Sequence, residues 1–325
     1  MNIIKPPRLH SGDTIGLIGV SNHIYDRQER FEQSIKIFEH EFGVKVKLGP
    51  HALGHYHYSS GTVQERLDDF HNMLIDPTIK AIQFTVGGET AIDLVDKLNY
   101  DLIKNNPKII SGFSDCTTLL NPIFAKTGLI TYHGLEFSFL GYDGHPQYML
   151  DSIRKTWFGD GGGDIKPNPS WRDWRGTFNR YHGWQIIRSG QAKGHLVGGN
   201  LTSFFQLLDT TYCPDLHGAI LIFESYKHEK KEVHRLFSAL RLHQVFDQIV
   251  GLVIGYNVGF DEQNDEDVTW GIKEILLEIT NQYDFPIIQI GEIGHYVENV
   301  IIPLGANATI DTTNLVFTIN IPTEI

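Results

Sequence analysis

The first half of the chain alternates short apolar runs with amphipathic helical patterns, and this alternation constrains the fold more than any other feature. Apolar runs predict buried strands at residues 14–20, 44–48, 81–86, 109–113 and 129–132. Apolar side chains that recur every three or four residues predict helices at 26–42, 62–75, 90–98 and 115–126. Strands separated by helices form parallel sheets covered on both faces. We therefore predict an α/β fold with a parallel sheet, covered by helices on both faces, in the N-terminal domain.

A segment rich in Gly, Pro and Asp, GDGGGDIKPNPSWRDW, interrupts this alternation. We predict a domain at 1–158, an interdomain linker and aromatic loop at 159–184, and a smaller mixed α/β, barrel-like C-terminal domain at 185–325. Four tryptophans lie on or near the linker, namely Trp157, Trp171, Trp174 and Trp184. These rings either anchor the linker against the two domains or form an aromatic wall of a ligand site.

Composition excludes several classes of function. Lys and Arg number 27 against 39 Asp and Glu, a net charge of −12, and no basic cluster stands out, so neither nucleic acid nor an anionic membrane is a predicted partner. The two cysteines, Cys116 and Cys213, cannot form a disulfide framework and favour a reducing compartment. The N-terminal residues resemble no signal peptide and no apolar run is long enough for a membrane span, so we predict a cytoplasmic protein.

Two turns at the ends of predicted parallel strands carry candidate catalytic groups. Ser114 in Gly-Phe-Ser-Asp-Cys lies between a strand and a helix, where helix amides stabilise a developing oxyanion. The pentapeptide resembles the G-x-S-x-G nucleophile elbow but has Cys116 in place of the second Gly, and taken alone it favours a helix cap. Gly87 and Gly88 follow another strand, where they form either a simple turn or a close approach to a ligand with an oxyanion donor.

Two further residues could complete a catalytic site. Glu224 ends the apolar run AILIFES and could orient a histidine, although a solvated strand end is the more common role of such a residue. His295 follows a short strand with glycines on both sides, and an imidazole is suited to general base catalysis near neutral pH.

A histidine cluster offers an alternative chemistry. His51, His55 and His57 could ligate zinc, but their spacing matches no common zinc pattern. We predict no metal and no cofactor, and we keep a zinc hydrolase as a rival hypothesis that predicts loss of activity with a chelator.

Four segments of this sequence together resemble the LD-carboxypeptidase and microcin C self-immunity family of serine peptidases. They match in order and spacing from about residue 4 to 321, and they read GDTIGLIGVSN, NYDLIKNNPKIISGFSDCTTLLNPIFAKTGLITYHG, GHLVGGNLTSFFQLLDTTYCPDLHGAILIFES and GEIGHYVENVIIPLGANATID. The resemblance implies a Rossmann-like N-terminal domain, a smaller C-terminal domain, and a Ser114, Glu224 and His295 triad. It also implies an oxyanion hole made by the backbone amides of Gly88 and Asp115, and a homodimer.

The resemblance leaves the substrate open between two subgroups. One trims the terminal D-alanine from murein tetrapeptides, and the other cleaves the amide between an amino acid and a nucleotide-like group. NPSWRDWRGTFNRYHGW is similar to the aromatic loop of the second subgroup, so Trp171 and Trp174 are candidate substrate contacts beside Gly87 and Glu89. Glu89 departs from the family pattern and would repel a substrate carboxylate if it pointed inward. A binding module that holds such a conjugate without cleaving it is the remaining alternative.

Overall fold

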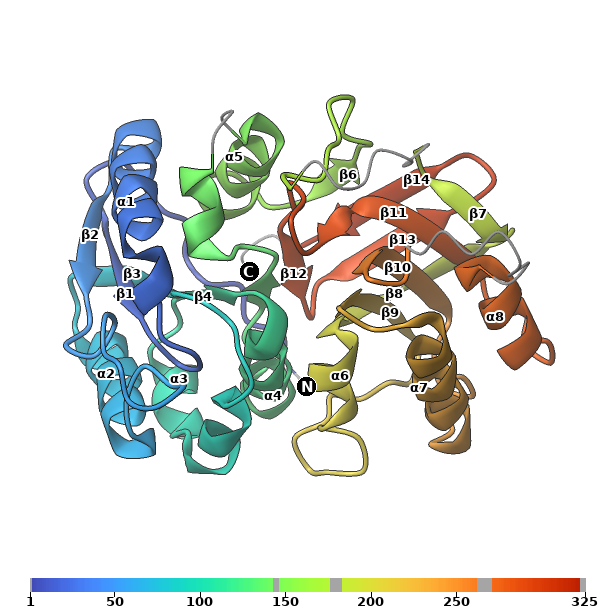
Figure 1. Ribbon diagram of the computed structural model, residues 1–325, viewed down its shortest axis with the longest axis horizontal. Coiled ribbons are helices and arrows are strands. Elements are labelled where there is room, and N and C mark those ends of the chain that lie inside the picture. The colour runs from blue at the N-terminus through green and yellow to red at the C-terminus, as the bar shows by residue number, and fades with distance from the viewer. Residues whose placement is uncertain (1, 143–145, 176–182, 262–270, 322–325) are drawn as a thin grey trace.

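The computed structural model describes residues 2–142, 146–175, 183–261 and 271–321, which form two β-sheets side by side (Figure 1). The first sheet has the strand order β12-β5-β4-β3-β1-β2. Its parallel strands are β1 (Thr14–Ile18), β2 (Lys45–Leu48), β3 (Ile79–Phe84), β4 (Ile109–Gly112) and β5 (Thr131–His133). The register pairs Ile15 with Val46 and Ile82 with Ile110.

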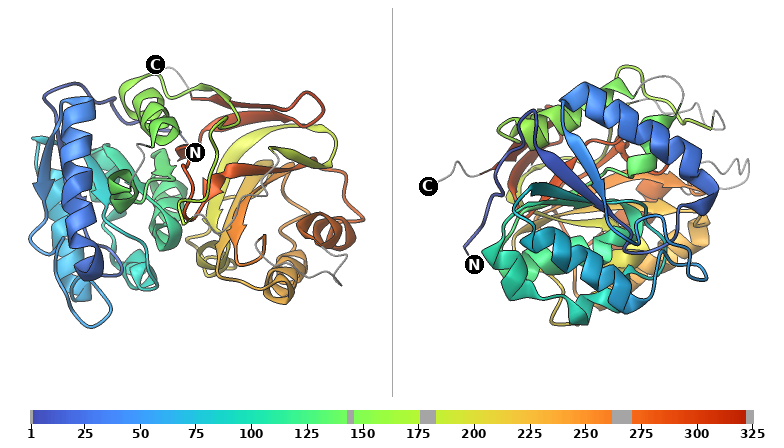
Figure 2. Two further views of the ribbon diagram at one scale, coloured as in Figure 1. Left: turned by 45° about the horizontal axis from the view of Figure 1, so that its top comes forward. Right: turned by 90° about the vertical axis from the view of Figure 1, so that its left-hand side faces the viewer.

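Helices cover both faces of the first sheet, with α1 and α2 on opposite sides (Figure 2). The helices of this half are α1 (Gln28–Phe42), α2 (Val63–Ile75), α3 (Tyr100–Asn105), α4 (Thr117–Thr127) and α5 (Gln147–Ile153). The start of α2 shows how local sequence sets a boundary, because Thr62 and Glu65 form a reciprocal capping box there.

The second sheet has eight strands in the order β6-β14-β13-β8-β9-β10-β11-β7. Its central strands β8 (Gln191–Asn200), β9 (Ala219–Tyr226), β10 (Gly251–Val258) and β11 (Ile287–Gly294) are parallel. Antiparallel pairings add β6 (Gly163–Ile165), β7 (Gln185–Arg188), β13 (Asn307–Asp311) and β14 (Val316–Asn320). The helices of this half are α6 (Leu201–Phe205), α7 (Lys230–Leu242) and α8 (Ile272–Ile279).

The two sheets exchange short segments. Strand β12 (Ile302–Leu304) comes from the C-terminal part of the chain but pairs antiparallel with β5 of the first sheet. Strand β6 comes from the predicted linker and pairs with β14 of the second sheet. The largest apolar core accordingly contains residues of both sheets, such as Ile110, Ile220 and Ile302. The two halves are therefore held together by shared strands as well as by packing.

The predicted α/β class, with a Rossmann-like parallel sheet followed by a mixed α/β unit, is confirmed. The second sheet nevertheless has more strands than the first, because it recruits β6 and β7 as well as the C-terminal hairpin. The helix predicted at 90–98 is a 3₁₀ helix at Ala91–Lys97. Among the described residues, no helix has the length and apolar character needed to span a membrane.

Candidate active site

Ser114 lies in a sharp turn between β4 and α4. Its φ of +59° is uncommon for a residue with a side chain and costs roughly 1–3 kcal/mol, so the surrounding structure must hold it in place. The Ser114 Oγ atom caps no helix amide among the described residues; its hydrogen bond is to the ring of His295. The helix-cap role, which the pentapeptide alone favoured, is therefore wrong, because the hydroxyl group bonds to the imidazole and not to a helix amide.

Ser114, His295 and Glu224 form a continuous hydrogen-bonded chain. His295 Nε2 lies 3.0 Å from Ser114 Oγ, and His295 Nδ1 lies 2.7 Å from Glu224 Oε2. With a neutral imidazole, Nδ1–H donates to Glu224 and Nε2 accepts from the serine hydroxyl. Three groups far apart in the sequence thus meet because each lies at or near the C-terminal end of a parallel strand: Ser114 after β4, Glu224 near the end of β9 and His295 after β11.

Glu224 is completely buried, so its role as a solvated strand end is wrong. Its Oε1 atom accepts a hydrogen bond of 2.9 Å from Asn200 Nδ2, at the end of β8. Burial opposes ionisation of this carboxyl group, but the charge and hydrogen bond of His295 and the Asn200 bond outweigh it and hold the pKa of Glu224 below its usual value. The carboxylate is therefore a fixed negative charge behind the imidazole.

Aromatic rings fix the plane of the His295 ring. Tyr226 stacks on it with ring centroids 4.3 Å apart and an interplanar angle of 21°, and the Phe113 ring lies 4.7 Å away on centroids. The Tyr226 hydroxyl also lies 2.8 Å from the Tyr296 hydroxyl. A second histidine near the site, His133, is completely enclosed, and burial lowers its pKa to about 4, so it stays neutral at neutral pH.

A pocket of about 270 Å³ opens beside Ser114 and His295. It is lined by Asn22, Arg27, Arg30, Val86, Gly87, Gly88, Glu89, Ser114, Glu136, Phe139, Tyr142, Tyr226, His295 and Tyr296. Its charged groups differ in their pairing. Arg27 lies 3.0 Å from Glu136, whereas Arg30 and Glu89 form no ion pair among the described residues. The Arg30 guanidinium lies over the Tyr142 ring at 4.2 Å from its centroid.

Gly87 and Gly88 pass directly along the nucleophile turn. A Cβ atom on Gly87 would lie 2.8 Å from Ser114 Cβ and 3.1 Å from the Asp115 backbone nitrogen. Gly88 has a φ of +151°, and a Cβ atom there would lie 2.3 Å from Asn22 Oδ1. Only glycine fits these positions, and the Gly88 amide donates to no acceptor in the described part of the chain.

Neither of the two tryptophans predicted to contact substrate is among the residues that line this pocket. Trp174 packs edge-on against Phe139 with ring centroids 5.0 Å apart and lies against Tyr142 at 4.9 Å, and it does not itself line the pocket. The Trp171 indole N–H donates to the backbone oxygen of Gly291 at 2.6 Å. Residues 176–182 of the predicted aromatic loop lie outside the described residues.

The three histidines of the zinc hypothesis make separate contacts. His51 hydrogen-bonds to Asp69 at 2.9 Å, His55 stacks with Tyr25, and the His57 ring packs edge-on against Tyr56. Within the described ranges, no group of three His, Cys, Asp or Glu side chains is arranged to hold a metal ion.

Sequence reasoning missed several residues at the site, although some left a signal. Tyr226 lies two residues after Glu224 in one strand, so the two side chains share a face of the sheet. Asn200 ends β8 and caps the next helix, which gives no hint of its bond to Glu224. Arg27 and Arg30, at the start of α1, carry no motif that relates them to residues a hundred positions away.

Comparisons with known proteins show the family and the fold of the chain. Two family models match the chain, the LD-carboxypeptidase N-terminal domain at residues 15–134 and the LD-carboxypeptidase C-terminal domain at residues 193–310. The chain is similar to the microcin C7 self-immunity protein MccF of Escherichia coli, with 29% identity over 93% of this chain and 92% of that protein. It is also similar to the murein tetrapeptide carboxypeptidase of Pseudomonas aeruginosa, with 26% identity over 84% and 86%.

A solved structure of MccF in complex with aspartyl sulfamoyl adenosine has the same fold. It superposes with a TM-score of 0.89 at 28% identity, over 98% of this chain and 99% of that one. The fold and these relatives define a hydrolase of the carboxypeptidase type. The chain belongs to the LD-carboxypeptidase family, as the four sequence segments indicated.

Proposed function

We propose that the protein is a serine peptidase that hydrolyses an amide bond through Ser114, His295 and Glu224. The observation that carries the proposal is the hydrogen-bonded chain from Ser114 Oγ through both nitrogens of His295 to the buried Glu224 carboxylate, with distances of 3.0 and 2.7 Å. A nucleophile, a base within hydrogen-bond reach and a group that orients the base are the three parts that acyl transfer requires.

The proposed reaction has two halves. His295 Nε2 accepts the Ser114 proton as Oγ attacks the amide carbonyl, and Glu224 stabilises the imidazolium that forms. The backbone amides of Gly88 and Asp115 are the proposed donors to the oxyanion. The imidazolium then protonates the departing amine, the C–N bond breaks, and an ester to Ser114 remains. Water, deprotonated by His295, hydrolyses that ester and regenerates the hydroxyl group.

We propose an aminoacyl-nucleotide conjugate as the substrate. Solved MccF structures hold aspartyl sulfamoyl adenosine and glutamyl sulfamoyl guanosine, whose aminoacyl groups carry both an ammonium and a carboxylate group. The pocket offers matching charges, because Glu89 has no described cationic partner and Arg30 has no described acidic one. Trp174 would contribute indirectly, because it packs against Phe139 and Tyr142, which line the pocket.

Removal of terminal D-alanine from a murein tetrapeptide is the second candidate. Arg30 favours it, since a free C-terminal carboxylate needs a cationic partner in the pocket. Incubation of the protein with murein tetrapeptide and, separately, with aspartyl sulfamoyl adenosine distinguishes the two by the masses of the products. A burst of nitrophenol from a p-nitrophenyl ester, with a matching mass gain on Ser114, distinguishes both from a binding module, which would show neither.

Arg30→Gln is expected to raise the KM about tenfold with little change in kcat. The reason is that a charge-assisted bond to a substrate carboxylate is lost equally in the ground state and the transition state, and about 1.4 kcal/mol of binding corresponds to a factor of ten. Steady-state kinetics on the preferred substrate measure both constants. Arg154→Gln is the matched control, because Arg154 pairs with Asp151 at the surface and does not line the pocket. A fall in kcat at unchanged KM would contradict this role.

The family resemblance also leads us to propose a homodimer located in the cytoplasm. Light scattering coupled to gel filtration measures the mass of the particle directly, and a monomer at micromolar concentration would contradict the proposed dimer.

A further inference from the structure

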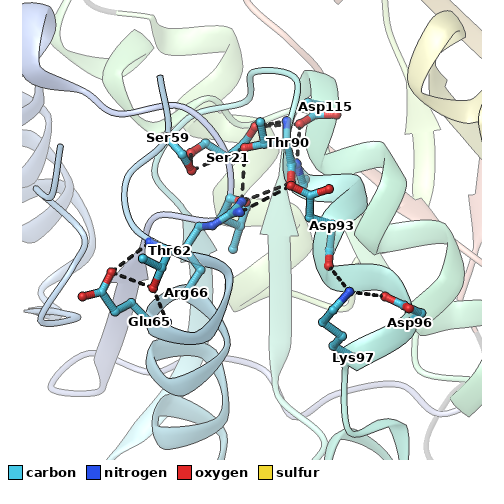
Figure 3. Close-up of polar contacts among 12 residues, drawn as sticks. Ser21, Ser59, Thr62, Glu65, Arg66, Thr90, Asp93, Asp96, Lys97 and Asp115 are labelled. Atoms are coloured by element: carbon cyan, nitrogen blue, oxygen red, sulfur yellow. Dashed lines mark hydrogen bonds and ion pairs between the residues drawn. The ribbon is translucent and has the colours of Figure 1, made fainter. Parts of the chain in front are cut away.

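A buried polar network lies behind the nucleophile turn and outside the triad (Figure 3). At its centre is the side chain of Asp115, which is 2% exposed. One carboxylate oxygen, Oδ2, accepts two hydrogen bonds, from Ser21 Oγ at 2.6 Å and from the Ala91 backbone amide at 2.9 Å. These donors follow β1 and β3, so Asp115 ties its own turn to the ends of two other strands.

Ser21 extends this connection by one residue. Its hydroxyl oxygen accepts a 3.1 Å hydrogen bond from the Thr90 amide, and its O–H donates a hydrogen bond to Asp115. The consecutive amides of Thr90 and Ala91 are thus both held by Asp115, one through Ser21 and one directly. Thr90 and Ala91 are the last two residues of the segment 87–91. We call this segment the glycine loop, because it begins with Gly87 and Gly88.

Arg66 holds the same loop from the other side. Its Nη1 atom donates to the backbone oxygens of Val20 at 2.7 Å and Thr90 at 3.1 Å, and lies 3.2 Å from Thr90 Oγ1. Arg66 is 2% exposed. Burial raises the pKa of the Asp115 carboxyl group above its usual value, and the hydrogen bonds from Ser21 and Ala91 and the positive charge of Arg66 oppose that rise only in part.

The position of the glycine loop bears directly on the reaction. The Cβ position of Gly87 lies 3.1 Å from the Asp115 nitrogen, so the loop lies against the amide that is one proposed oxyanion donor. Gly88 carries the other donor. Two successive glycines are conformationally free and lose more entropy on ordering than other residues, so a loop that contains them keeps its amides aligned only if its ends are anchored.

We propose that the Asp115 side chain is a positioning residue that anchors the glycine loop so that the Gly88 and Asp115 amides converge on one oxygen atom. Asp115 then has two separate tasks: its backbone amide donates to the oxyanion and its carboxylate sets the position of the second donor. The inference rests on the proposed function, because it assumes that Ser114 is the nucleophile.

The test uses three variants and a reagent that needs no knowledge of the substrate. A fluorophosphonate forms a bond from Ser114 Oγ to phosphorus, fluoride leaves, the hydroxyl proton passes to His295, and the phosphoryl oxygen occupies the oxyanion hole. Loss of one oxyanion donor lowers kcat about 10²–10³-fold in a serine protease. A displaced donor should cost less, so Asp115→Ala is expected to lower both kcat and the rate of fluorophosphonate labelling about 10–100-fold, with the KM within about threefold.

The two other variants separate geometry from charge. Asp115→Asn keeps an oxygen that can accept both bonds and should recover most of the rate lost in Asp115→Ala. Ser21→Ala releases only the Thr90 amide and should cost about tenfold in both rates, an intermediate loss. If Asp115→Ala fails to fold, as judged by circular dichroism, Ser21→Ala still carries the test.

Asp96→Ala is the matched control, since Asp96 pairs with Lys97 at the surface in the same part of the molecule. Wild-type labelling rates in folded Asp115→Ala or Ser21→Ala would overturn the inference, and so would an Asp115→Asn variant as slow as Asp115→Ala. Failure of the proposed function is separately visible, because in that case the reagent would not label Ser114 in the wild-type protein.

Discussion

Replacement of Ser114 with alanine is expected to lower amide hydrolysis about 10⁶-fold, the size of loss found when the nucleophile of a serine protease triad is removed. The reason is that His295 has no other hydroxyl within the observed hydrogen-bonded chain to activate. The melting temperature should change by no more than a few degrees, because the lost bond joins a half-buried hydroxyl group to a ring that keeps its bond to Glu224. Product formation and a thermal melt measure the two effects.

Ser189→Ala provides the control for this variant, because Ser189 is exposed and lies outside the pocket. The control protein should keep its activity and its covalent labelling. A Ser114→Ala variant that still hydrolyses the substrate would contradict the proposed serine mechanism, whatever its melting temperature. A variant that is inactive but unfolded would be replaced by Ser114→Gly, which also removes the hydroxyl group and adopts a φ of +59° without steric cost.

Local sequence patterns predicted the elements that position the site. Strand 109–113 and helix 115–126 were expected on either side of Ser114, and the structure has β4 and α4 there, separated by a 3₁₀ turn. These predictions succeeded because buried strands and amphipathic helices leave a periodic apolar signal that depends only on neighbours in the chain. The place of Ser114 between them followed from the same signal.

The pairing of distant groups was not available from local patterns. Nothing near Glu224 distinguishes it from a solvated strand end, and only the resemblance to the family linked it with His295. The bond of Asn200 to Glu224 arises from the pairing of β8 with β9, and that of Arg27 to Glu136 joins residues 109 positions apart, so no short window of sequence records either of them. The positive φ of Ser114 is likewise set by its surroundings. In the sequence, only the pair Gly87 and Gly88, which packs against this turn, indicated a close approach of the backbone.

Replacement of Glu224 with glutamine is expected to lower kcat about 10⁴-fold while the pocket and the KM are kept. The glutamine amide can occupy the same volume, but it carries no charge to stabilise the imidazolium, and its NH₂ group can face the ring and favour the wrong tautomer. Steady-state kinetics from pH 5 to 9 measure the loss. Glu278→Gln is the matched control, since Glu278 is an exposed residue of α8.

The same variant tests the electrostatic state of the site through stability. The pKa of Glu224 is lower in the folded protein than the value of about 4.3 of an unfolded chain, so its ionised form stabilises the fold above pH 4.3. That contribution is lost as the pH falls through the folded pKa. The unfolding free energy of the wild-type protein should therefore exceed that of Glu224→Gln at pH 7, and the difference should shrink below about pH 4. A difference that grows in acid would mean that Glu224 is protonated in the folded protein, and such a group could not hold His295 as a base.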